Sequence, residues 1–536
     1  MTDRGLDPVS LQVLVGALRA ACDEMGAVLI RSARSPNITE RHDCSTALFA
    51  ADGELVMQAE HIPVHLGSMP DAVAAVLDAE QREGGLWILN DPYRGGTHLP
   101  DITLISPLFA DRRLIGFAAS RAHHADIGGP TPGGMPADST SLDEEGVVIA
   151  PTRADDEVLR GLADRMRRPE ERLADLRAQR AANLTGARRV GELVERHGAD
   201  GLGTAMAEIL DYAERRTRAA LSELADGEYA AEDVLEGGPG GSRDVTVRVS
   251  ARIAGDALTL DFTGSAEQVP GNLNCPLSVT KSAAFFAVRA LTDPDAPPSA
   301  GAYRPVEVLA PPGCLLNARP PGAVVAGNVE TSSRVADLVL AALGSATHGV
   351  GQGQGTMNNL TLAPAPSAPQ HPGDGRAEAG EAQREWTYYE TIGGGQGACP
   401  DADGPSAIHV AMSNTLNTPI EALETEYPVR VRELGVRRGS GGAGRHRGGD
   451  GIVREIEALE PMRYTLITER RRHPPRGRGG GADGAPGKNL LNGEPLPSKA
   501  SGELRAGDRL RIETPGGGGY GSAAGDGHGG GETSRA

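Results

Sequence analysis

Histidine and aspartate gather in two short, glycine-rich segments of the N-terminal quarter of the chain. Of the 13 histidines among 536 residues, five fall within residues 61–124. Residues 90–101 read NDPYRGGTHLPD and contain His98 and Asp101, while residues 120–129 read SRAHHADIGG. Imidazole and carboxylate groups together suit Mn²⁺, Fe²⁺ or Zn²⁺, and two histidines with one carboxylate leave coordination positions open. One such segment would suggest only turn and capping residues, but two favour a metal site.

The second segment contains adjacent histidines, and strand geometry separates their roles. Neighbouring side chains on a strand point to opposite faces, so His123 and His124 should not both face one ion. If the chain stays extended, Asp126 lies on the same side as His124. We therefore expect one histidine to be a ligand and the other to be its neighbour or an acid–base group.

Three further polar residues have a functional and a plainer interpretation. His65, in the sequence HIPVHLG, could line the same pocket, but a loop whose imidazoles bond backbone carbonyls is slightly favoured. Glu330 stands where a helix is expected to begin, so a capping role is favoured over a catalytic one. Cys275 has no neighbouring base in the sequence and is expected to be a packed thiol.

Two glycine runs could also bind a ligand. The run at 393–397 (GGGQG) could form an anion-binding nest of backbone amides, although a tight turn is favoured. The run at 515–520 (PGGGGY) is expected to be a flexible closing loop.

Composition excludes several classes of protein. The formal net charge is −19 and aromatic residues make up 3% of the chain, which disfavours binding to nucleic acid through phosphates or base stacking. Of the three lysines, only Lys488 follows a glycine, and Asn489 comes next, so there is no P-loop. Five scattered cysteines, no signal peptide and no long apolar run predict a cytoplasmic protein without a membrane span.

The candidate residues need a scaffold, and periodicity predicts one of mixed type. The 73 glycines and 38 prolines indicate many turns and loops. Helical spacing and alternation predict helices at 9–31, 69–80, 281–291 and 333–343, and strands at 86–89, 102–105, 114–120, 244–253 and 257–262. Asp52-Gly53, between apolar runs, predicts a hairpin.

These elements predict a multi-lobed α+β fold with glycine- and proline-rich mixed sheets and a β-rich C-terminal part. We expect six divisions along the chain. They are an α/β region with the metal site (1–165), a helical segment (166–230), a mixed α/β region (231–363), a disordered insert (364–384), a β-rich region (385–522) and a disordered tail (523–536).

Several motifs together resemble the hydantoinase B/oxoprolinase family. The resemblance runs from about residue 7 to about residue 521. The motifs are RHDCSTALF (41–49), HIPVHLGSMPD (61–71), NDPYRGGTHLPD (90–101), HHADIGG (123–129), GNLNCP (271–276), GNVETS (327–332) and TPGGGGYG (514–521).

The resemblance implies a division of labour between two subunits. A separate A-type subunit with an actin-like ATPase fold binds ATP and phosphorylates the substrate carbonyl, and this B-type chain acts on the activated species. The large subunit of acetone carboxylase is similar and holds Mn²⁺ with a His-x-x-Asp motif and a later histidine. That pattern implies that His98, Asp101 and His123 hold a divalent ion here.

Within that scheme we expect a cyclic amide hydrolase subunit, active in a hetero-oligomer. His124 or Asp126 would move protons or orient a ligand imidazole. Arg94 or Arg121 could receive phosphate by bidentate contact, with His65 and Glu330 as further substrate contacts. A ketone carboxylase subunit and a non-catalytic scaffold for the A-type subunit are the alternatives.

Overall fold

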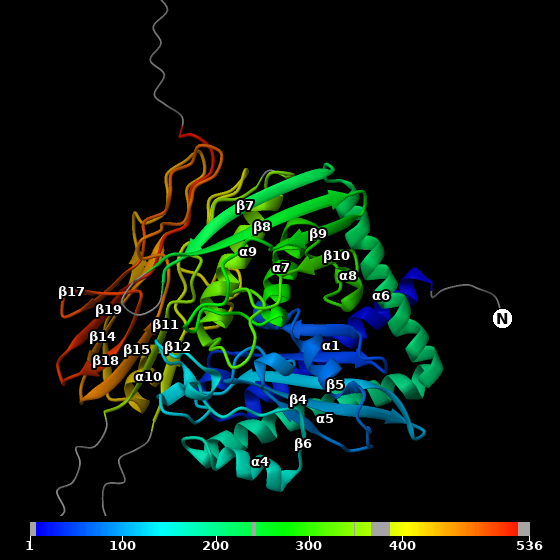
Figure 1. Cartoon of the computed structure of the whole chain (residues 1–536). Helices are drawn as coiled ribbons and strands as arrows, with labels where there is room; N and C mark the ends of the chain where they lie inside the picture. The colour runs from blue at the N-terminus through cyan, green and yellow to red at the C-terminus, as the bar shows by residue number, and fades with distance from the viewer. Residues whose placement is uncertain (1–6, 238–242, 348, 366–385, 524–536) are drawn as a thin grey trace, which may run out of the picture.

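The computed structural model describes residues 7–237, 243–347, 349–365 and 386–523. The chain combines helices with strands that form four sheets, which confirms the α+β prediction (Figure 1). The predicted disordered insert and tail lie almost entirely outside the described residues. No helix in the described part of the chain is long and apolar enough to cross a membrane.

The first sheet is antiparallel and carries the histidine-rich segments. In spatial order its strands are β2 (Leu55–Glu60), β1 (Cys44–Ala50), β5 (Arg113–His123), β4 (Asp101–Ala110), β3 (Trp87–Leu89) and β6 (Thr152–Arg153). The predicted turn at Asp52-Gly53 joins β1 to β2, and Gly53 has φ +85°. The pair β4–β5 extends further than predicted, because β4 runs from Asp101 to Ala110 and β5 continues to His123.

Helices cover both faces of this sheet. Helices α1 (Pro8–Ser32) and α5 (Pro169–His197) pack on the face that carries Leu48, and α3 (Met69–Leu77) packs on the face that carries Phe49. The alternation of β1 therefore places successive side chains in two separate cores.

A second lobe is built on four strands. They are β10 (Val306–Leu309), β9 (Ala257–Asp261), β8 (Val245–Ala254) and β7 (Gly227–Leu235). Alternate residues of β8 are buried against α7 (Leu277–Leu291) and α9 (Ser332–Leu343). Both helices were predicted from the spacing of apolar residues. Helix α6 (Ala199–Ser222) runs beside this lobe (Figure 1).

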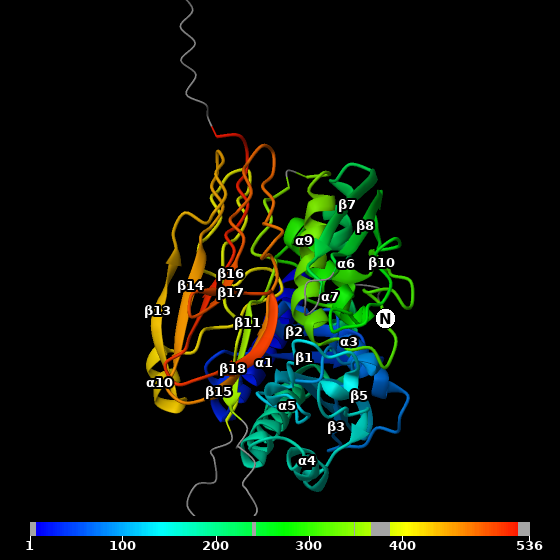
Figure 2. The same cartoon turned by 60° about the vertical axis from the view of Figure 1, so that its left-hand side comes forward.

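The C-terminal part consists of two sheets that pack face to face (Figure 2). One contains β12 (Tyr388–Glu390), β11 (Asn359–Pro364), β15 (Met462–Ile467) and β18 (Lys499–Leu504). The other contains β13 (Val429–Arg437), β14 (Gly451–Ala458), β19 (Arg509–Glu513), β16 (Lys488–Leu491) and β17 (Glu494–Leu496).

Short helices occupy the connections. They are α2 (Pro36–Thr39), η1 (Pro63–His65), η2 (Pro92–Arg94), η3 (Pro132–Gly134), η4 (Leu142–Glu144), α4 (Asp156–Ala163), α8 (Ala300–Tyr303), the π-helical η5 (Gly327–Thr331) and α10 (Ile420–Glu426).

The glycine runs form neither a tight turn nor a flexible loop, so both expectations were wrong. They are extended segments, and Gly449 from a third segment hydrogen-bonds to both of them. The Gly449 N–H donates to the Gln396 carbonyl at 2.8 Å, and the Gly517 N–H donates to the Gly449 carbonyl at 2.9 Å. A Cβ on Gly517 would lie 2.0 Å from the Gln396 carbonyl oxygen. Glycine is needed here because the backbones touch.

Candidate metal centre

The candidate residues meet where β4 and β5 end. Asp101, the first residue of β4, is the cross-strand partner of His123, the last residue of β5. His98 lies one turn before Asp101, whose N–H donates to the His98 carbonyl at 3.1 Å. Strand pairing and this turn thus bring together side chains that are distant in sequence.

Their ligand atoms converge on one point. The distance from His98 Nε2 to Asp101 Oδ1 is 3.0 Å, and that from His123 Nδ1 to the same oxygen is 3.2 Å. All three ligand atoms lie within 4.8 Å of one another. The three residues are at most 3% exposed, so they are shielded from bulk water.

The chemistry of this donor set fits a divalent ion. Nδ1 of His98 and Nε2 of His123 have no hydrogen-bond partner in the described chain. Burial lowers the pKa of His123, which favours the neutral imidazole that binds metals. Burial opposes ionisation of Asp101, but His98 and hydrogen bonds from the histidines hold its pKa well below the usual value.

His65 joins this cluster, so the favoured interpretation of a loop imidazole bonded to backbone carbonyls was wrong. Its Nε2 lies 3.4 Å from Asp101 Oδ2, and its Nδ1 lies 2.9 Å from Ser45 Oγ. The 3₁₀ turn of η1 directs the ring inward, and the side chain is buried. Three imidazoles therefore surround one carboxylate.

Arg121 holds the loops around the cluster. Its Nε donates to Thr103 Oγ1 at 2.7 Å, and its Nη2 donates to the Gly95 carbonyl at 3.0 Å. Its Nη1 donates to Ser68 Oγ at 2.5 Å, three residues beyond His65. Arg121 is buried and each of its guanidinium nitrogens donates one of these bonds, so it fixes the positions of the loops around the cluster.

Arg94 and Glu330 lie outside the cluster. Arg94 is exposed and lines a separate cleft of about 630 Å³. Glu330 is buried in η5, where it caps no helix end, which corrects the capping prediction; its Oε1 accepts from the Met357 N–H at 3.3 Å. Burial and the nearby Glu469 raise the pKa of Glu330 to about 8. Cys275 is a packed thiol as expected, and burial raises its pKa to about 12.

His124 and Asp126 are not brought to the cluster. His124 faces α5, where its Nε2 lies 3.0 Å from Gln179 Oε1. Asp126 accepts from the N–H groups of Gly128 and Gly133 and from the backbone and guanidinium of Arg167, at 2.8–3.1 Å. Neither side chain has a hydrogen bond to a ligand imidazole in the described structure. Asp126 instead holds the glycine-rich loop.

Residues that sequence reasoning did not single out complete the site. The Tyr389 ring stacks on His123 with centroids 4.5 Å apart and an interplanar angle of 13°. Arg41 donates to the Tyr389 carbonyl at 2.7 Å and lies over its ring. Asp43 lines the cavity beside His123, and burial raises its pKa. The motif RHDCSTALF contained Arg41 and Asp43, but spacing gave no sign of Tyr389.

The cavity at the cluster is small. It measures about 20 Å³, and its lining comes from the first sheet and adjoining loops, from η1 and η5, and from β12 and the segment that follows it. That volume holds about one water molecule or an ion. A ring substrate needs more room than this cavity provides.

Comparison with known proteins matches nearly the whole chain to one family. The family model for hydantoinase B/oxoprolinase matches residues 7–523. A 5-oxoprolinase from Dictyostelium discoideum is 37% identical over 96% of this chain, and the chain spans only 40% of that relative's length. A protein from Pseudomonas sp. (strain NS671), named as a putative B-type D-/L-hydantoinase component, is 30% identical, with 96% of this chain and 90% of that protein covered.

Two solved structures share the fold. The ATP-dependent caprolactamase from Pseudomonas jessenii superposes with a TM-score of 0.87 at 28% identity, covering 97% of this chain and 92% of that chain. A nucleotide-free acetone carboxylase superposes with a TM-score of 0.83 at 17% identity, covering 96% of this chain and 76% of that chain. The second likeness concerns the fold alone.

Proposed function

The chain belongs to the hydantoinase B/oxoprolinase family, and we propose that it is the ring-opening subunit of an ATP-dependent cyclic amide hydrolase. A cyclic amide has a weakly electrophilic carbonyl carbon and a poor leaving group. Phosphorylation of the carbonyl oxygen in a partner A-type subunit would make that carbon electrophilic. ATP would bind the actin-like fold of the partner, and the chain's match to only 40% of the length of a 5-oxoprolinase is compatible with such a second half.

The convergence of His98, Asp101 and His123 carries this proposal. These residues would hold a divalent Mn²⁺, Zn²⁺ or Fe²⁺ ion. Such an ion, when bound, lowers the pKa of a coordinated water toward ~7 and so supplies hydroxide near neutral pH.

Neighbouring residues would position the ligands and move protons. His65 would orient Asp101 through its 3.4 Å contact, and Tyr389 would fix the ring of His123 by stacking. Asp43 lines the same cavity, and its carboxylate would transfer protons there. His124 and Asp126 would act only by holding the strand end and the following loop.

Reconstitution tests the proposal. The chain alone should not open hydantoin or 5-oxoproline with ATP, and co-expression with an A-type subunit should produce ATP-dependent ring opening. His98→Ala in the same complex should abolish ring opening, with the two chains still co-eluting. Full activity of the His98→Ala complex, or ring opening by the isolated chain, would refute the assignment.

A ketone carboxylase subunit is the second candidate, because acetone carboxylase shares the fold over 96% of this chain. It predicts ATP consumption that depends on both bicarbonate and a ketone. A scaffold without catalysis predicts a purified complex that contains no stoichiometric metal. Elemental analysis and a bicarbonate-omission assay on the same preparation separate these outcomes.

A further inference from the structure

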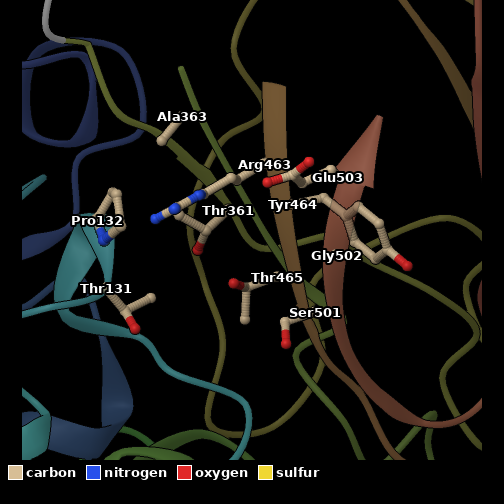
Figure 3. Close-up of a pocket in the computed structure, with 10 residues that line it drawn as sticks. All are labelled: Thr131, Pro132, Thr361, Ala363, Arg463, Tyr464, Thr465, Ser501, Gly502 and Glu503. Atoms are coloured by element: carbon tan, nitrogen blue, oxygen red, sulfur yellow. The ribbon is translucent and has the colours of Figure 1, made fainter. Parts of the chain in front are cut away.

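A second cavity lies on the outer face of the C-terminal sheet that contributes Tyr389. It has a volume of about 280 Å³ and is bordered by the loop at 131–132 and by β11, β15 and β18 (Figure 3). It is therefore far larger than the 20 Å³ cavity at the metal centre.

One row of cross-strand partners links the two cavities. Tyr389 pairs with Thr361, Thr361 pairs with Thr465, and Thr465 pairs with Ser501. Directly opposed residues in antiparallel strands place their side chains on the same face. The row begins at Tyr389, whose ring stacks on His123, and ends at the exposed Ser501. The row thus runs from the tyrosine beside the metal centre to the threonine and serine side chains that line the larger cavity, and the linings of the two cavities share no residue.

Arg463 faces this cavity and has no partner among the residues that the structure describes. Arg463 lies in the adjacent row, between Ala363 and Glu503. Figure 3 shows its guanidinium extended toward Pro132 and away from the carboxylate of Glu503. In the described chain Arg463 has no hydrogen bond or ion pair, although it is half-buried. By contrast, Arg511 on the neighbouring sheet contacts Glu433, Glu455 and Glu513.

We propose that this cavity is a recognition site for cyclic amides that carry a carboxylate, with Arg463 as its anion-binding residue. A guanidinium without a protein partner can form a bidentate pair with a ligand carboxylate. The hydroxyls of Thr361 and Thr465 lie on the same face and can bond a ring amide. This inference rests on the proposed function, because it names the substrate class of the same chain.

Two matched substrates test the proposal in the complex with the A-type subunit. 5-Oxoproline carries the carboxylate and 2-pyrrolidinone lacks it, whereas their rings are the same. Arg463→Gln should lower kcat/KM for 5-oxoproline by about 10- to 100-fold. The same variant should change kcat/KM for 2-pyrrolidinone by less than about twofold. Equal losses for both substrates, or no loss for 5-oxoproline, would overturn the proposal.

Two control variants each remove a charge but leave the guanidinium of Arg463 in place. Glu503→Gln changes the opposing residue in the same cavity, and Arg505→Gln removes an exposed cation that does not line it. Neither should reduce the preference for 5-oxoproline. Thermal unfolding of each variant shows that the fold persists.

A binding measurement keeps this inference separate from the proposed function. Saturation-transfer NMR on the isolated chain should detect 5-oxoproline with the wild type and with His98→Ala, and should lose the signal with Arg463→Gln. No binding by the wild type, or binding retained by Arg463→Gln, refutes the recognition site. Ring opening absent for both substrates in a well-assembled complex refutes the proposed function instead.

Discussion

Tyr389 and His123 come from different lobes, and their rings stack almost in parallel with centroids 4.5 Å apart. Strand β12 of the C-terminal sandwich thereby buttresses the end of β5 in the first sheet. Arg41 reinforces the contact, since it bonds both the Tyr389 carbonyl and Thr391 Oγ1 at 2.7 Å. The metal centre is therefore completed by two lobes together.

Tyr389→Leu should weaken metal binding without abolishing it. Removing the aromatic ring frees the His123 imidazole, and residues that orient a ligand typically matter by ~10–100-fold in metal affinity or activity. Tyr389→Phe keeps the stacking and loses only the 3.2 Å contact to Asn359, so it should stay close to wild type. Metal titration followed by elemental analysis measures both. Equal affinity of all three proteins would contradict the role given to the ring.

Adjacent histidines provide a matched test of the metal ligands. His123→Ala and His98→Ala each remove a ligand, and each should lose nearly all bound metal and activity while the circular dichroism spectrum persists. His124→Ala removes an equally buried imidazole that faces Gln179, so it should retain the metal. Full metal retention by both ligand variants would show that the ion binds elsewhere.

Asp126→Ala should lower the free energy of unfolding while the protein retains most of its bound metal. The carboxylate accepts from Gly128, Gly133 and Arg167, and its loss leaves buried N–H groups unpaired. A buried unsatisfied donor costs about 1–3 kcal/mol in the free energy of unfolding. Denaturant unfolding measures this, with Asp143→Ala on the exposed η4 turn as a control. A stable variant depleted of metal would instead place Asp126 at the centre.

Strand patterns predicted part of this site, and their limits have physical causes. Alternation separated His123 from His124 correctly, because it depends only on local backbone geometry. The role of Tyr389 depends on a contact between lobes, and the periodicity of a sequence reports local structure rather than contacts between distant segments. Single-residue spacing also failed for His65, since a 3₁₀ turn set its direction. The glycine runs were misread because hydrogen bonds between distant extended segments leave no local signature.

Glu330 should make stability depend on pH. Burial raises its pKa to about 8 from the ordinary value of 4.5, so the native state binds more protons than the unfolded state between these values. The contribution of Glu330 to the free energy of unfolding is fully present below pH ~4.5 and is lost as the pH rises through ~8. The loss is at most about 1.4 kcal/mol for each pH unit.

Glu330→Gln removes that titration while preserving the shape of the side chain. The difference in unfolding free energy between the variant and the wild type should therefore grow in favour of the variant from pH 5 to pH 8. Denaturant unfolding at four pH values measures the difference. A difference that does not change with pH would show that Glu330 is ionised in the native state throughout.

The contact between glycine segments predicts a severe effect from a single methyl group. Gly517→Ala would place a Cβ 2.0 Å from the Gln396 carbonyl oxygen, a backbone atom that cannot rotate away. Relieving the clash requires separating two hydrogen-bonded segments, so we expect a loss of about 3 kcal/mol in the free energy of unfolding. Gly435→Ala is the matched control, because a Cβ there meets no atom within 4 Å. It should stay within about 0.5 kcal/mol of wild type. If the two variants unfold at the same denaturant concentration, close backbone packing is not what requires glycine at residue 517.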